Sequence, residues 1–455
     1  MELDARLQDK LIGTLRTELP KLRLSDAGRL DIQSMFDADR AFTAVLRGAP
    51  SRLKEKIEAY VGERPMVSLM FGTLTDELLL LSPEAKAGKS RLCELPQYSD
   101  VEALANRLLA LLTALPNQYV AVVELPASIS DELYKSSAPP ILGRQLAIIG
   151  AWHEKQSGYP YPTSDVTEKP PQNALMSLLG IAALPTTMSA SGQPTIDAQP
   201  PSRRSHLYVR LEGYINSIFS PQPLNRFTTL LKAFFGLAFG MEVLESGWKI
   251  LNSDQLLINI YQSSADDFLK IEEETIGDNT SALIRKVSVS TGGRGRIVQD
   301  LQTIVHVLDM EETLPQLVLA GRWLFDSRSN GDELMGFMQL AICAEVLLGT
   351  EDGGEGVTAM LATRCAYLIA SSAKERDDLV TEFKSIYKVR SKIVHRGLGT
   401  LKENERHQFR RLRTICNRVV QREIQLAIMD GPQHQQALKM AEALRSYPEP
   451  KAIQH

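Results

Sequence analysis

The chain has 455 residues, of which 44% are hydrophobic and 23% are charged; this composition is typical of a folded protein and excludes a largely disordered chain. The formal net charge of −4 at pH 7 excludes a strongly basic nucleic-acid coat protein. Any binding to nucleic acid must therefore come from a local patch of charge or from a site that recognises geometry.

The four cysteines are scattered, without the close spacing of a zinc site or a dithiol motif. We therefore expect a reducing compartment, no metal and no cofactor. Cys343, Cys365 and Cys416 lie in apolar helical segments, which predicts small core residues. The first residues lack the apolar stretch of a signal peptide, and the most apolar runs, at 108–115 and 230–244, are too short to span a bilayer. We expect a cytoplasmic protein without membrane contact.

Residues 1–155 are predicted to form an N-terminal α/β region, because helical and strand-like patterns alternate there. Its predicted elements are charged amphipathic helices over 1–60, an apolar run at 66–71, a helix at 99–116 and strands at 119–126 and 144–152.

Residues 156–204 are rich in Pro, Ser and Thr, which predicts a linker or a long loop. A mixed α/β middle region is expected over 205–300, with a strand at 206–215, a long helix at 226–246 and a loop at 290–296. From residue 301 to 430 the pattern is almost wholly helical, and a tail follows over 431–455. The chain is therefore predicted to be an α+β multidomain protein.

Three predicted helices, near 331–349, 357–371 and 374–396, each carry one charged residue on an otherwise apolar stripe. These residues are Glu345, Arg364 and Arg390. Because an unpaired buried charge costs several kcal/mol, we expect them to lie near one another or near a polar cleft. A structural ion-pair network and a site that holds one arginine at an interface are both open interpretations.

Arg390 is followed five residues later by His395, an R-x4-H spacing that is weak on its own. On an ideal helix, residues five apart point about 140° from one another, so a straight helix does not direct both side chains to one point. Gly397 marks the expected end of the helix, which places His395 in the last turn, where the geometry can relax. A helix C-terminus also favours a protonated histidine.

Together, the order and spacing of these features resemble the Apea-like branch of the HEPN superfamily. The shared features are a helix with a glutamate (ICAEVLLG), a helix with an arginine (LATRCAYLI) and the segment IYKVRSKIVHRG, which follows the pattern aromatic, R-S-x-x-x-H-x-G. Arg396, directly after the histidine, departs from this pattern. The resemblance covers about residues 320–429 and does not extend to residues 1–300. It implies an all-α helical bundle over 301–430 that forms a homodimer or a higher even oligomer.

The resemblance also implies a metal-independent endoribonuclease in which Arg390 and His395 of two subunits face each other. Imidazole can transfer protons near neutral pH, and a guanidinium can stabilise the charge of the phosphorane. The expected products end in a 2′,3′-cyclic phosphate and a 5′-hydroxyl. The supporting residues that we expect are Glu345, Arg364, Ser391 and Tyr387.

Basic residues elsewhere are candidates for contacts to RNA. Seven basic and two acidic residues lie between Lys402 and Arg422, and this excess either steers RNA or forms a solvated helix face paired with acidic neighbours. The loop at 290–296 could present N–H groups and guanidinium groups to a phosphate, although an exposed turn is the favoured interpretation. The candidate RNA-binding residues are Arg396, Lys402, Arg406, Arg410, Arg294 and Arg296.

The leading prediction is a regulated endoribonuclease, a toxin or an anti-phage defence effector of the abortive-infection kind, whose N-terminal region senses a trigger or binds substrate. Its expected partners are an RNA substrate, a second copy of the chain, and a phage or antitoxin protein that triggers or inhibits it. The alternative is a non-catalytic HEPN module that serves dimerisation or binds RNA or a nucleotide.

Overall fold

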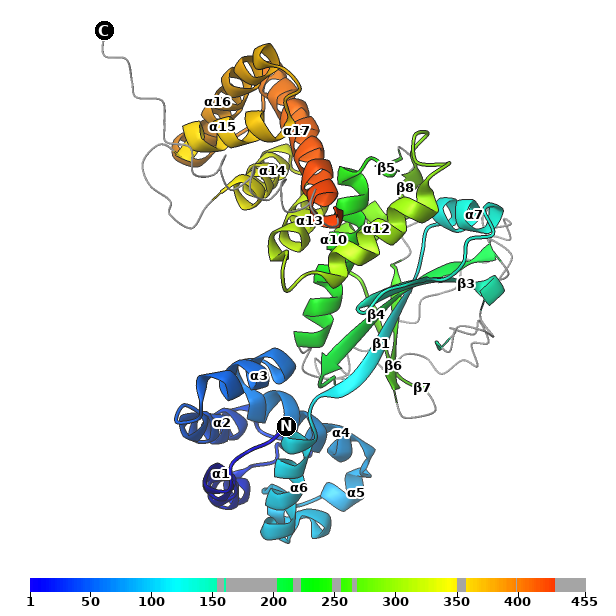
Figure 1. The fold of residues 1–455 in the computed structure, drawn as a ribbon. Helices are drawn as coiled ribbons and strands as arrows, with labels where there is room; N and C mark the ends of the chain where they lie inside the picture. Colours follow the sequence, from blue (N-terminus) through cyan, green and yellow to red (C-terminus); the bar gives the residue numbers. More distant parts are fainter. Residues whose placement is uncertain are drawn as a thin grey trace.

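A computed structural model describes residues 1–153, 159–160, 203–215, 222–247, 255–263, 268–349, 357–397 and 399–429. The predicted linker at 156–204 lies largely outside these residues, and the predicted tail at 431–455 lies wholly outside them. In Figure 1, N-terminal helices lie at the bottom, an antiparallel sheet lies in the middle, and the C-terminal helices lie at the top. The fold is α+β.

The N-terminal part is helical up to residue 116, with a hydrophobic core of its own. In α1, Leu7, Leu11 and Leu15 recur every fourth residue and are buried, and Asp4 caps the helix by accepting a hydrogen bond from the Leu7 N–H. These helices confirm the prediction for residues 1–60. The helices of this part are α1 (Ala5–Glu18), α2 (Ile32–Leu46), α3 (Ser51–Val61), α4 (Gly72–Leu80), α5 (Pro83–Lys86) and α6 (Val101–Ala114).

The apolar run at 66–71 is a π-helical turn that continues directly into α4. Met66, Leu69, Met70 and Phe71 are completely buried, so the run is apolar because it crosses the centre of the N-terminal core. Strands therefore begin only at residue 117, and the predicted α/β character of 61–155 applies to its last part alone. A short apolar run cannot by itself distinguish a buried helix from a strand.

The strands at 117–150, 205–213 and 257–275 join in one six-stranded antiparallel sheet with the order β2-β3-β4-β1-β6-β7. The sheet thus takes strands from both sides of the predicted boundary between residues 1–155 and 205–300. A separate two-stranded antiparallel sheet joins β5 and β8. The strands are β1 (Asn117–Glu124), β2 (Ile141–Leu142), β3 (Leu146–Gly150), β4 (Ser205–Gly213), β5 (Leu244–Ser246), β6 (Leu257–Ser263), β7 (Phe268–Thr275) and β8 (Val287–Val289).

One face of the sheet packs against helices, and the core continues from there into the C-terminal helices without interruption. Helix α10 contacts β4, and α12 contacts β2 and β3. The predicted strands and the predicted helical stretch beyond residue 301 are confirmed. The remaining helices are α7 (Ala127–Lys135), α10 (Gln222–Gly240), α11 (Asp278–Arg285), α12 (Ile297–Asp309), α13 (Pro315–Ser329), α14 (Glu333–Leu348), α15 (Val357–Ile369), α16 (Ala373–Arg396) and α17 (Glu403–Ile428).

The long helix predicted at 226–246 ends earlier than expected, at Gly240. Glu242 has a left-handed backbone with φ of 59°, which ends the helix and turns the chain into β5. The run remains apolar through this turn because Val243 and Leu244 are buried in the same core. Apolar periodicity alone therefore could not locate the turn.

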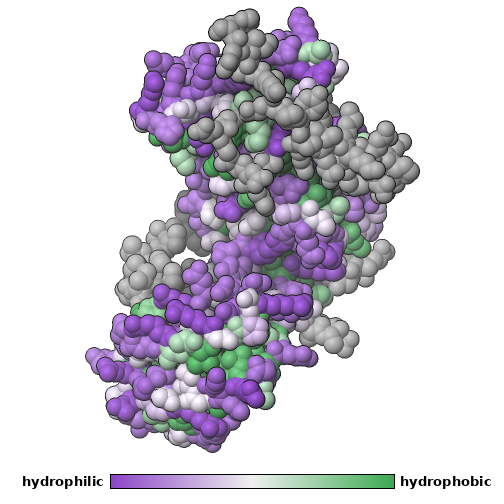
Figure 2. Space-filling model, turned by 60° about the vertical axis from the view of Figure 1, so that its left-hand side comes forward, coloured by the Kyte–Doolittle hydropathy of each residue, from purple (hydrophilic) through white to green (hydrophobic). Residues whose placement is uncertain are grey.

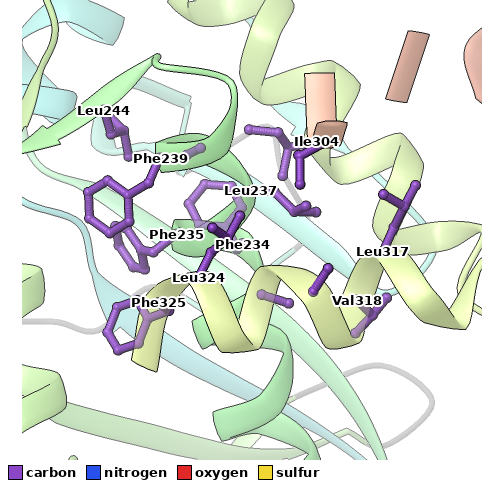
Figure 3. Close-up of a cluster of buried hydrophobic side chains, with 14 of the residues drawn as sticks. Phe234, Phe235, Leu237, Phe239, Leu244, Ile304, Leu317, Val318, Leu324 and Phe325 are labelled. Atoms are coloured by element: carbon purple, nitrogen blue, oxygen red, sulfur yellow. The ribbon is translucent and has the colours of Figure 1, made fainter. Parts of the chain in front are cut away.

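Helices α10 and α13 approach each other through two glycines. A Cβ atom added to Gly236 would lie 1.8 Å from the Gly321 carbonyl oxygen, and one added to Gly321 would lie 2.7 Å from the Ala233 carbonyl oxygen. The helices thus cross with their backbones in contact. Aromatic side chains flank the crossing: Phe234, Phe235 and Phe239 from α10, with Phe325 from α13 (Figure 3).

The outer surface is mostly polar on the face drawn in Figure 2, where hydrophobic side chains gather mainly over the lower, N-terminal part. Among the described residues, no helix has both the length and the apolar character needed to cross a membrane. Cys343, Cys365 and Cys416 are buried, which confirms their predicted place in the core.

Replacing Gly236 with Ala is expected to destabilise the protein by about 1–3 kcal/mol, because the added methyl group has no space between α10 and α13. Gly13 is the matched control: it is an exposed helical glycine with nothing within 4 Å of an added Cβ, so Gly13→Ala should be neutral or slightly stabilising. Chemical denaturation measures both. Equal stability of the two variants would contradict the close crossing.

His206 on β4 is only 4% exposed, and burial, with a smaller contribution from Arg204, lowers its pKa to about 4. In the unfolded chain this imidazole titrates near pH 6.5. Between pH 6.5 and 4 the unfolded chain binds a proton that the folded chain does not. The free energy of unfolding should therefore decrease by up to about 3 kcal/mol as the pH is lowered from 6.5 to 4.

Urea denaturation from pH 7 to 4 should therefore show a shallower loss of stability for His206→Gln than for the wild type. His407→Gln, at an exposed position on α17, should keep the wild-type slope. If stability depended on pH equally in all three proteins, His206 would bind its proton as readily in the folded chain as in the unfolded chain, which would contradict the lowered pKa.

Candidate functional site

The candidate site is built on α16, whose two ends are both capped. Ser372 precedes the helix and accepts a hydrogen bond from the Glu375 N–H, and Gly397 follows it in the left-handed conformation with φ of 60° and ψ of 46°. The buried side of the helix carries Leu379, Phe383 and Ile386. The predicted helix end at Gly397 is confirmed.

Arg390 and Glu345 form an ion pair between α16 and α14, with 3.3 Å between Nε of the arginine and Oε1 of the glutamate. Each side chain is 31% exposed, so the pair lies at the edge of the helical core. This partial burial strengthens their attraction relative to a fully solvated pair, although Nε of Arg390 forms no hydrogen bond within the described part of the chain. The pair joins two of the three charges that the sequence places on apolar stripes.

Arg364 on α15 lies at the C-terminal end of α14, the end that carries Glu345. Its Nη1 donates a hydrogen bond to the Leu348 carbonyl oxygen over 2.9 Å, one turn beyond Glu345. Leu348 is the last residue of α14, so Arg364 binds a carbonyl that has no partner within the helix. This contact places Arg364 in a structural role, at the end of the helix that carries Glu345.

Tyr387 lies one turn before Arg390 and is buried. Its hydroxyl donates to the Ala341 carbonyl oxygen over 3.3 Å, and its ring stacks on Phe383 with 4.8 Å between the centroids. Burial, together with the nearby charge of Glu345, raises the pKa of Tyr387 far above its ordinary value. The phenol therefore joins α16 to α14 and remains protonated at neutral pH.

His395 is exposed in the last turn of α16. The helix remains regular through Arg396, so the expected relaxation of the last turn does not occur, and about 140° separates the directions of Arg390 and His395. Ser391 and Arg396 are also exposed. Within one chain, Arg390 therefore lies against α14 and His395 lies at the surface.

Most basic residues of α17 are paired with carboxylates. Arg406 pairs with Glu333 at 2.9 Å, and Arg410 pairs with Glu403 at 3.1 Å. Lys402 is exposed, and its backbone N–H donates to the Glu405 carboxylate. Two further ion pairs of this helix join Arg411 to Glu382 and Arg418 to Glu375. These contacts favour the interpretation of a solvated helix face paired with acidic neighbours.

The loop at 290–296 is an exposed turn, as favoured from the sequence, and both of its arginines are exposed. Arg296 pairs with Asp300 at 3.0 Å and borders a cavity that Arg328 and Arg413 also line. Arg328 was not predicted from the sequence, although it also is a charged residue beside the apolar stripe of a helix, α13. Its position three residues after buried Phe325 and four after buried Leu324 is the signal that would have found it.

Among the described residues, no group of three or more His, Cys, Asp or Glu side chains is arranged to hold a metal ion. No family model, no curated protein and no solved structure matches this chain.

Replacing Arg390 with Ala is expected to lower the free energy of unfolding by about 1 kcal/mol, because Glu345 then stays partly buried without its counter-charge. His395→Ala should change stability by less than about 0.5 kcal/mol, because that side chain is exposed at the end of a helix. Urea denaturation at pH 7 measures both. A larger loss for His395→Ala than for Arg390→Ala would contradict the division of roles along α16.

Proposed function

We propose that the helices α12 to α17 form a HEPN-type domain, and that the protein is a metal-independent endoribonuclease with Arg390 and His395 as its catalytic residues. The observation that carries the proposal is the contrast along α16: Glu345 holds the Arg390 guanidinium, whereas His395 is exposed at the helix end. A group that stabilises charge must be held still, and a group that transfers protons must reach the substrate.

The proposed site is shared between two copies of the chain, in a homodimer or a higher even oligomer. Within one copy the two side chains diverge by about 140°, so one helix does not enclose a phosphate between them. A facing copy would supply the missing half.

In the proposed reaction, the RNA 2′-hydroxyl loses its proton to an imidazole and attacks the adjacent phosphorus. The bond from phosphorus to the 5′-oxygen breaks, and a protonated imidazole supplies the proton to that oxygen. The Arg390 guanidinium stabilises the extra negative charge on the phosphorane without itself titrating. The products are a 2′,3′-cyclic phosphate and a 5′-hydroxyl.

The larger part of the chain, residues 1–300, is the proposed regulatory region. Families that the C-terminal helices resemble often act as toxins in defence against phage. We propose a regulated effector of this kind, with a phage or antitoxin protein as its trigger or inhibitor.

The alternative is a non-catalytic HEPN module that dimerises or binds RNA or a nucleotide, and one observation favours its form that does not bind RNA. Arg406 and Arg410 are engaged by Glu333 and Glu403, so the helix after His395 offers RNA less free positive charge than its sequence suggests. Binding without cleavage asks less of the site than catalysis does.

Wild-type protein incubated with total RNA in EDTA is expected to cleave the RNA, and His395→Ala should lose this activity by at least about a hundredfold. His407→Ala is the matched control, because it removes another exposed histidine and should retain full activity. The 5′ ends of the fragments should accept phosphate from polynucleotide kinase without prior phosphatase treatment, as free 5′-hydroxyls do.

Cleavage that EDTA abolishes, or that His395→Ala retains, would contradict the proposal. A wild-type dimer that binds RNA or a nucleotide and cuts nothing would support the alternative module. Sedimentation of the same samples tests the shared site, since a strictly monomeric active enzyme would exclude it.

A further inference from the structure

A second site candidate is a cavity of about 960 Å³ at the other end of α17. Its walls are the turn between α10 and β5, the loop at 290–296, the first turns of α12, and helices α13 and α17. Figure 1 shows the end of α17 reaching this region beside α10 and α12. Arg390 and His395 do not line it, so the cavity is independent of the proposed nuclease site.

Two arginines of the cavity differ from most other arginines of their helices. In the part of the chain that the structure describes, Arg328 and Arg413 form no ion pair with a carboxylate, although Arg406, Arg410, Arg411 and Arg418 do. Burial lowers the pKa of Arg328 to about 9 and also lowers that of Arg413. Each guanidinium repels the other in this desolvated setting.

The surroundings hold both guanidinium groups in place without neutralising them. Arg328 lies over the Phe239 ring and Arg413 over the Phe409 ring, each with 4.9 Å from the guanidinium carbon to the ring centroid. Arg328 also donates to the Leu324 carbonyl oxygen at 3.2 Å, whereas Nε of Arg413 is buried without an acceptor. Two fixed, poorly solvated cations with unused donors fit a bound anion.

The rest of the lining offers hydrogen bonds of both kinds. Asn417 is buried between Arg328 and Glu242. Its amide oxygen accepts from Arg328 at 3.5 Å, and its amide nitrogen donates to Glu242 at 3.3 Å. Glu242 and Glu245 are exposed and can accept from hydroxyl or amino groups. The cavity therefore combines a cationic interior with acceptors at its rim.

We propose that this cavity binds a nucleotide, with the phosphates on Arg328 and Arg413 and the sugar hydroxyls near Glu242 and Glu245. The volume suits a ligand of this size. Three arginines and three carboxylates line the cavity, and one of each, Arg296 and Asp300, is already paired. This balance favours a phosphate ester with hydrogen-bond donors over a plain polyanion.

The test uses the full-length chain carrying His395→Ala, so that nuclease activity does not affect the result. Each ribonucleoside triphosphate and inorganic pyrophosphate are titrated by calorimetry, and the melting temperature is recorded with and without them. At least one triphosphate should bind and raise the melting temperature. Adding Arg413→Gln should weaken its Kd at least about tenfold, the effect of losing one charge-assisted contact.

Arg322→Gln is the matched control, because Arg322 lies on α13 beside Asp326 and outside the cavity, and it should bind as the parent does. Without ligand, Arg413→Gln should be at least as stable as the parent, because it removes a desolvated and unpaired charge. A merely structural Arg413 would instead lower the melting temperature without ligand.

The proposal fails if no triphosphate binds, or if Arg413→Gln binds as tightly as the parent. It also fails if a short single-stranded RNA binds through Arg413 and no triphosphate does, because the cavity would then be an RNA contact. Arg328→Gln provides a second, independent loss of binding if Arg413→Gln does not fold.

Discussion

The close crossing of α10 and α13 is the constraint on which the arrangement of the molecule depends. Gly236 and Gly321 let the two backbones touch, and no side chain fits between them. Helix α10 packs against the sheet through β4, and α13 packs against α14. The crossing therefore fixes where the C-terminal helices stand relative to the sheet, and with them both candidate sites. The buried side chains of Phe235, Phe239 and Phe325 keep the crossing out of contact with water.

The arginines of α17 divide into those that form an ion pair with a carboxylate and those that do not. Arg406, Arg411 and Arg418 each form an ion pair with a carboxylate outside α17 and join the helix to its surroundings, whereas Arg410 pairs with Glu403 of the same helix. Arg413 has no such partner among the described residues and rests on an aromatic ring. An unpaired cation that is partly removed from water lowers stability unless something else offsets its cost. Such a residue is a natural place to look for a ligand.

The same logic separates the two residues of the R-x4-H motif. Arg390 and its partner Glu345 form part of the contact between α16 and α14, with buried Tyr387 one turn away. His395 takes no part in that packing and is exposed. Substitution of Arg390 is therefore expected to affect folding as well as the proposed function, whereas substitution of His395 tests the proposed function alone. Helix geometry makes this division unavoidable, since residues five apart cannot share a face.

The local elements could be predicted from the sequence, because helix periodicity, caps and β-branched runs act over a few residues. The sequence located the helices beyond residue 301, the end of α16 at Gly397, and the strands at 119–126 and 206–215. It also singled out Arg390 and Glu345 as charges that needed partners. Tertiary structure alone decided that strands from both sides of 156–204 share one sheet, and that Arg328 and Arg413 meet at one cavity. Those pairings join residues far apart in the chain, and no local pattern encodes which distant segment will be the neighbour.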